Sequence, residues 1–220
     1  MDSKRLKHIV KLIGILSILY LIISIPMLFM AWNLLLAVIP LVLALLLKKI
    51  SESNSKKPVK TVVLAVFWLL FFPNAPYIIT DFIHISELNF FARENYYGPA
   101  AYRMNITVWL RLVDICIGVV LGIVIGMLSL YIIHQLIIKK RGKKLAAAAV
   151  GAVCLLSGCA IYVGRFLRLN SWDIIRPIYL LSRFFESINL FFVLFSCLFA
   201  VFTAFLYFLF YTFYHKEVND

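Results

Sequence analysis

The sequence predicts an all-α integral membrane protein, a single domain (residues 1–220) of about six transmembrane helices. The chain is 64% hydrophobic and only 15% charged, whereas about a quarter of the residues in soluble domains are charged. Its mean hydropathy is +0.98. The lysines that contribute most of the net charge of +12 cluster in short segments between apolar runs. Such clusters mark membrane topology, so we expect no nucleic-acid partner.

Six apolar runs approach the length of about 20 residues that a transmembrane helix needs. Their approximate bounds are 12–30, 32–47, 61–80, 106–138, 145–164 and 188–210. We expect them to form three hairpins in the cell membrane, with both termini in the cytoplasm. No small-residue cleavage site follows the first run, so we expect the N-terminus to be retained as span one.

The first hairpin is predicted from charge and from one aromatic residue. Lys4, Arg5, Lys7 and Lys11 precede span one, which favours a cytoplasmic N-terminus. We expect Trp32 and Asn33 to lie in a very short outer connection, with the tryptophan as an interface anchor. The lysine-rich segment 48–60 is then a solvated cytoplasmic linker.

The third span contains a predicted break. It reads W-L-L-F-F-P-N-A-P-Y-I-I-T-D-F-I-H from Trp68 to His84. Pro73 and Pro76 lack an N–H and disfavour helix in the preceding residue, so a helix should break or kink at Asn74 to Ala75. The carbonyls freed there need partners, which in a membrane means burial in protein or a water-filled cavity. The break therefore predicts a pocket.

Four polar side chains around this break are the first candidate site residues. If α-helix resumes after Pro76, then Tyr77, Asp81 and His84 lie at i, i+4 and i+7 on one face. Asn74 then lies one turn deeper in the membrane. We expect this stripe to face the ligand.

The segment F-P-N-A-P-Y-I-I-T-D-F-I-H also resembles the signature of a bacterial multi-pass membrane protein family, domain of unknown function 1361. The resemblance extends more weakly to A-W-N-L-L-L-A-V-I-P, residues Ala31 to Pro40, and to the six-span layout. It implies a multi-pass membrane protein. It implies no catalytic residue, cofactor or ligand.

Span four combines a glycine ridge with two charged residues. Gly118, Gly122 and Gly126 form G-x-x-x-G-x-x-x-G, which allows another helix to approach closely. Arg111 and Asp114 lie on nearly the same face, toward the outer end. We expect them to be buried together as an ion pair.

Span five carries a similar run of small residues and ends in a second polar outer segment. Its small residues repeat every three or four positions, so we expect spans four and five to pack against each other. They are Ala147, Gly151, Cys154 and Gly158. The outer segment that follows supplies the candidate residues Arg165, Arg168 and Asp173.

All lysines fall on the expected cytoplasmic side, and seven arginines fall elsewhere: Arg93, Arg103, Arg111, Arg165, Arg168, Arg176 and Arg183. A guanidinium binds carboxylate or phosphate at two points, which lysine does not reproduce. One interpretation is that these arginines pair with the acids on the same side and join the helix ends. The other is that some of them bind an anionic ligand above the broken helix.

Three functions are consistent with the sequence. The first is binding or translocation of an anionic, lipid-linked or phosphate-bearing ligand, because transporters use discontinuous helices at their substrate sites. Six spans are few for a translocator, and a homo-oligomer or a carrier of membrane lipids would meet that objection. The alternatives are a membrane enzyme built on Asp81, His84, Asp114 and Asp173, or a non-catalytic assembly partner of envelope proteins. No metal or cofactor motif is present in the sequence.

Overall fold

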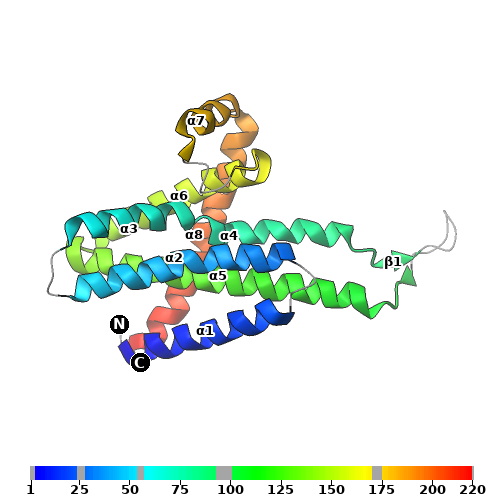
Figure 1. The fold of residues 1–220 in the computed structure, drawn as a ribbon, viewed down its shortest axis with the longest axis horizontal. Helices are drawn as coiled ribbons and strands as arrows, with labels where there is room; N and C mark the ends of the chain where they lie inside the picture. The colour runs from blue at the N-terminus through cyan, green and yellow to red at the C-terminus, as the bar shows by residue number, and fades with distance from the viewer. Residues whose placement is uncertain (1–2, 24–27, 54–56, 93–100, 170–174, 220) are drawn as a thin grey trace.

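The computed structural model describes residues 3–23, 28–53, 57–92, 101–169 and 175–219, and in them it confirms the predicted helical fold (Figure 1). The helices are α1 Ser3–Ile23, α2 Leu28–Glu52, α3 Pro58–Phe71, α4 Asn74–Tyr77, the 3-10 helix η1 Ile78–Glu87, α5 Ile106–Arg141, α6 Lys143–Phe166, α7 Pro177–Glu186 and α8 Leu190–Asn219. Two short strands, β1 Phe91–Ala92 and β2 Ala101–Tyr102, pair antiparallel.

Six helical segments within the described residues are long and apolar enough to cross a membrane. They are α1, α2, the continuous run from α3 through α4 to η1, α5, α6 and α8. The protein is therefore a multi-pass membrane protein. α7 lies in a segment for which the sequence predicts only a polar connection.

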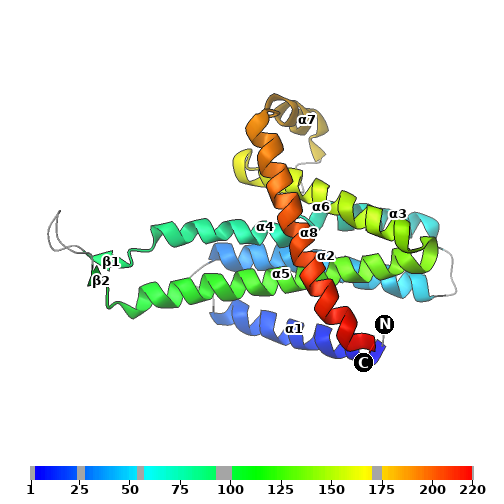
Figure 2. The same ribbon diagram turned by 180° about the vertical axis from the view of Figure 1, so that it is seen from behind.

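The long helices α2, α3 and α5 run side by side, and α8 crosses them obliquely (Figures 1 and 2). α2 packs most extensively on α5, and α6 on α8. One end of the bundle, called here the lysine end, carries Lys48, Lys139 and Lys143. The opposite end, called here the Asp81 end, carries Asn33 and Asp81.

The glycine ridge of α5 packs against protein, as predicted. A Cβ at Gly126 would collide with the Ala75 side chain of α4, and one at Gly122 would lie 2.8 Å from the Ile78 side chain of η1. Missing side chains thus let the break in the third span pack directly on α5.

The small residues of α6 do not pack on that ridge. A Cβ at Gly158 would collide with the backbone carbonyl of Ser196 in α8, while one at Gly151 would have no neighbouring atom within 4 Å. α6 does contact α5, but its closest backbone approach is to α8. Spans four and five are packing partners, as predicted, because α6 contacts α5. The glycines of the two runs do not face each other, because spacing shows that close approach is allowed and does not select the partner.

The turn of the first hairpin also differs from the prediction. α1 ends at Ile23 and α2 begins at Leu28, so Trp32 and Asn33 lie inside α2 instead of in a connection. Pro26, which cannot continue a helix, lies between the two helices in the sequence. Asn33 is consequently held on a rigid helix.

A buried polar chain joins three helices near the middle of the bundle. The Trp68 indole N–H of α3 donates to the Ser129 hydroxyl of α5 over 2.8 Å, and that hydroxyl donates to the Pro40 carbonyl of α2 over 2.8 Å. Ser129 is fully buried. Because buried polar groups are costly when unpaired, this chain fixes how α2, α3 and α5 align.

Candidate ligand-binding cavity

The break in the third span is a change of hydrogen bonding, not an unwound segment. The Ala75 N–H donates to the Phe72 carbonyl (3.0 Å) instead of continuing the α-helical pattern to Phe71. The Asn74 side-chain amide donates to the Phe71 carbonyl over 2.9 Å and takes that place. The carbonyl freed by the proline-containing segment thus has a partner, as the sequence predicted.

After the break the chain continues as a 3-10 helix, η1, for ten residues. Runs of this kind are usually three or four residues long, and longer ones often mark a functional hinge or strain. Side chains three apart are eclipsed in a 3-10 helix, so Ile78, Asp81, His84 and Glu87 share one face. The predicted stripe of Tyr77, Asp81 and His84 is therefore wrong in register: Tyr77 falls on another face, and Glu87 joins Asp81 and His84.

Asp81 is almost completely buried, with only 1% of its surface exposed. Its carboxylate accepts a 2.6 Å hydrogen bond from the Asn33 side-chain amide of α2. Two side chains that can be cationic, His84 and Arg165, lie within electrostatic range of it. A buried carboxylate needs such partners, and Asn33 joins η1 to α2 at this end of the bundle.

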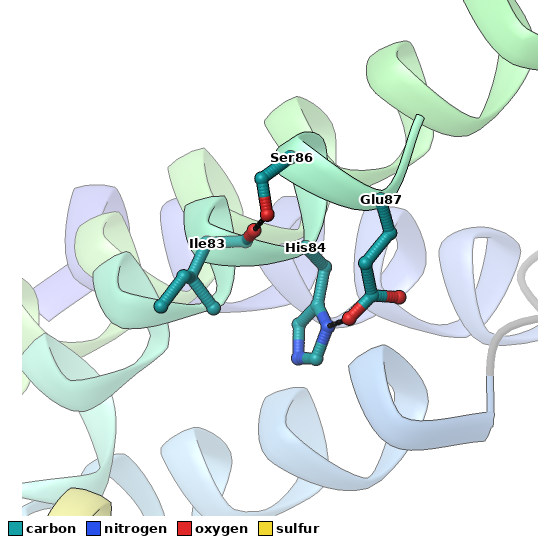
Figure 3. Close-up of polar contacts among 4 residues, drawn as sticks. All are labelled: Ile83, His84, Ser86 and Glu87. Atoms are coloured by element: carbon teal, nitrogen blue, oxygen red, sulfur yellow. Dashed lines mark hydrogen bonds and ion pairs between the residues drawn. The ribbon is translucent and has the colours of Figure 1, made fainter. Parts of the chain in front are cut away.

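His84 and Glu87 form a second polar contact on the same face of η1 (Figure 3). His84 Nδ1 lies 3.0 Å from Glu87 Oε1, and the carboxylate is mostly exposed. The imidazole also packs on the Phe29 ring of α2, with centroids 4.6 Å apart. Asp81 and His84 thus turn to different partners, which does not favour a shared acid–base site.

A cavity of about 390 Å³ lies beside the break. Its walls come from α2, the α3–α4 junction, α6, and α7 with the segment before it. The lining residues are Trp32, Asn33, Leu36, Leu70, Pro73, Asn74, Tyr77, Leu156, Cys159, Ala160, Val163, Gly164, Leu169, Leu180 and Phe184. This volume falls within the range of small-molecule sites.

The cavity wall is mostly apolar and includes a few polar side chains. Asn33, Asn74 and Tyr77 supply amide and hydroxyl groups, and Trp32 adds an indole N–H. Gly164 makes room for the tyrosine, since a Cβ there would lie 3.2 Å from the Tyr77 ring. Of the candidates predicted from sequence, Asn74 and Tyr77 line the cavity, while Asp81 touches its wall through Asn33.

Two of the candidate arginines flank the cavity without lining it. Arg165 follows Gly164, and the exposed Arg168 precedes Leu169. Arg168 has a φ of 55°, a conformation that is uncommon for residues other than glycine. Within the described ranges, no ion pair joins an arginine at the Asp81 end to a carboxylate. The predicted arginine–carboxylate pairing is therefore not found among these residues.

Arg111 and Asp114 lie away from the cavity, on a helix that contributes none of its lining. Arg111 is exposed and Asp114 is partly buried, so the prediction that they are buried together is wrong. The Asp114 backbone carbonyl accepts a 3.1 Å hydrogen bond from the Tyr20 hydroxyl of α1. An arginine near a helix end can extend to the membrane surface and need not be buried. Asp173 lies outside the described residues.

The family model described as "Protein of unknown function (DUF1361)" matches residues 32–206, well over half of the chain. The chain belongs to the DUF1361 family. The match contains every residue that lines the cavity, whereas α1 precedes it entirely. No curated protein and no solved structure matches the chain.

Two features of the site in this DUF1361 protein are not predicted from the sequence. Asn33 is expected in a connection, although a lone amide in an apolar run can mark a buried contact. Leu180 and Phe184 of α7 line the cavity at i and i+4, a spacing that signals one helical face. In the described part of the chain, no group of three or more His, Cys, Asp or Glu side chains is placed to hold a metal ion.

Proposed function

We propose that this protein binds an amphipathic, lipid-like ligand with an anionic, phosphate-bearing head group in the cavity beside the broken third span. The observation that carries this proposal is the cavity itself, about 390 Å³ of largely apolar space with amide and hydroxyl groups among its lining side chains. Ligand sites typically have this composition. The space suits one acyl chain or one head group better than a whole two-chain lipid.

The arginines support an anionic head group. Arg165 and Arg168 adjoin the cavity wall and form no ion pair with a carboxylate in the described residues. A guanidinium that remains available can bind phosphate at two points. Asp81 is engaged by Asn33, so the carboxylate nearest the break already has a hydrogen-bond donor.

The 3-10 segment supports a role in translocation as well as in binding. Transporters place discontinuous helices at their substrate sites, and η1 is a long stretch of a helix type that often acts as a hinge. Movement of the ligand across the membrane would then involve η1 and α7, which lines the cavity. A homo-oligomer would supply further spans for such a path.

The proposed orientation places the cavity toward the outside of a cell membrane and both termini in the cytoplasm. The one-sided distribution of lysine supports it. In a cysteine-free background, an impermeant thiol reagent should label Arg103→Cys in intact cells and spare Lys57→Cys. The reverse pattern would invert the topology.

Cys159 offers a direct test of binding because it lines the cavity. In a variant that keeps only this cysteine, lysophosphatidic acid should slow its alkylation by a maleimide. Monoacylglycerol with the same chain lacks the phosphate and should protect less. A protein that keeps only Cys197, which is exposed on α8, is the matched control and should show no such difference.

Two further variants separate the parts of the proposal. Ala160→Phe should fill the cavity and remove ligand-dependent protection of Cys159. Arg165→Gln with Arg168→Gln should abolish the preference for the phosphate-bearing lipid. Equal protection by both lipids in the wild type would remove the anionic head group from the proposal, and no protection by either would overturn it.

A further inference from the structure

A second polar pocket lies at the lysine end of the bundle, away from the cavity at the Asp81 end. It has a volume of about 310 Å³ and lies between the last turns of α2 and α5. Lys48, Ser51 and Glu52 line it from α2, and Gln135 and Lys139 line it from α5. Ile132, Leu136 and Ile138 form its apolar wall.

Gln135 supplies a donor that lacks a partner. Its side-chain amide nitrogen is buried and makes no hydrogen bond to any described residue. A buried donor left unpaired lowers stability, so such groups usually signal a missing water or ligand. This nitrogen belongs to a residue that lines the pocket.

Lys48 adds a charge that is only weakly compensated. It is 9% exposed, and its ammonium lies 3.7 Å from the carboxylate of Glu52, whose side chain is 57% exposed. Because the Glu52 carboxylate is solvated and the pair is long, it offsets the lysine charge only weakly. Lys139 brings a second ammonium, so the three charged side chains of the pocket carry a net positive charge.

The partial negative charges at the helix C-termini do not reverse the net positive charge of the pocket. A helix C-terminus carries about half a negative charge, and both α2 and α5 end near the pocket. Lys49 lies in the last turn of α2, and Lys139, Lys140 and Arg141 lie in that of α5. These basic residues carry more positive charge than the two half charges offset.

We propose that this pocket binds a phosphate group, with Lys48, Lys139 and the Gln135 amide as its donors. The pocket is independent of the cavity at the Asp81 end and shares no residue with it. Two sources can present this chemistry: the head group of an anionic phospholipid, and a free phosphate in solution. The apolar wall of Ile132 and Leu136 favours the phospholipid.

The test uses the full chain, purified in an uncharged detergent, with the Ala160→Phe substitution so that the first cavity does not contribute. Its unfolding temperature is measured with added phosphatidylglycerol or phosphatidylcholine, and separately with sodium phosphate or sodium chloride at equal ionic strength. A ligand that binds only the folded state raises this temperature. We expect phosphatidylglycerol to raise it and phosphatidylcholine to leave it unchanged.

Two variants address the residues. Gln135→Leu should fold at least as well as its parent, because it removes an unpaired donor. It should bind phosphatidylglycerol roughly tenfold more weakly, the loss expected for one hydrogen bond to a charged group. Lys139→Gln changes an exposed side chain, so folding is not at risk, and it should weaken binding similarly. Lys140→Gln is the matched control: it removes the same charge from the next residue, which does not line the pocket. Phosphatidylglycerol should still raise the unfolding temperature of this variant.

Each outcome decides the proposal. A shift with phosphatidylglycerol alone assigns the pocket to a lipid head group, and a shift with sodium phosphate assigns it to free phosphate. No shift with either overturns the proposal. Equal losses in Lys139→Gln and Lys140→Gln also overturn it, because they would show only nonspecific attraction to a basic surface.

Discussion

The two runs of small residues, one in α5 and one in α6, look alike in sequence and contact different parts of the molecule. In α5, Gly122 and Gly126 face Ile78 and Ala75 of the broken third span. In α6, Gly158 faces the backbone of α8, and Gly151 faces open space. The α5 run therefore positions the break beside the cavity, whereas the α6 run joins two straight helices.

The kinds of atoms at each contact differ as well. At α5 the nearest atoms belong to side chains, but at Gly158 they belong to the backbone of Ser196 and Ala200. The Ile78 side chain can turn aside, whereas the Ala75 methyl group and a backbone inside a helix cannot. Similar small-residue motifs thus predict that two helices approach closely. The loss of stability when a glycine is replaced depends on which atoms face that glycine.

The largest loss is expected at the contact between backbones. Gly158→Leu should destabilise the protein by about 3 kcal/mol or more, because α6 and α8 would have to move apart. The measurement is the unfolding temperature in detergent, together with the fraction of monodisperse protein. A wild-type unfolding temperature would show that α6 and α8 are not in close contact.

A smaller loss is expected at the break. Gly126→Leu should cost about 2–3 kcal/mol by colliding with Ala75, and Gly122→Leu about 1–2 kcal/mol because the Ile78 side chain can turn. Gly126→Ala should be partly rescued by Ala75→Gly, which removes the opposing methyl group. If the double variant is no more stable than Gly126→Ala alone, the two residues do not contact each other.

The polar chain beside the α5 ridge should show an intermediate effect. Ser129→Ala leaves the buried Trp68 indole N–H without its acceptor and should cost about 1–2 kcal/mol. Ser196→Ala on α8 is the matched control, since the Ser196 hydroxyl is buried with no hydrogen-bond partner among the described residues. The unfolding temperature of Ser196→Ala should be unchanged or slightly higher than that of the wild type. A large drop would contradict the expected difference between the two serines.

The smallest effect is expected where the small-residue run faces open space. Gly151→Ala should be neutral or stabilise α6 by about 0.5–1 kcal/mol, because glycine has the lower helix propensity. Unfolding temperature again provides the measurement. A clear destabilisation would reveal a partner at this position, such as a second copy of the chain.

Much of the site was accessible from sequence because its chemistry is local. Proline at positions 73 and 76 removes N–H donors whatever the rest of the chain does. The Ala75 N–H between the two prolines donates to Phe72, and the neighbouring Asn74 side chain donates to the Phe71 carbonyl that this shift frees. The sequence does not show which faces the residues of η1 occupy. That depends on the choice between α and 3-10 hydrogen bonding, which is set by the packing of η1 against α5.

The sequence by itself determined the membrane class, the six spans, the position of the break and two of the residues that line the cavity. Apolar length, charge placement and proline chemistry act over neighbouring residues, so a linear pattern records them. Only the tertiary structure decided that Asn33 binds Asp81, 48 residues away, that Gly158 faces α8, and that α6 and α7 complete the cavity. Those contacts join distant segments, and their selection depends on how whole helix surfaces fit together, which no local period encodes.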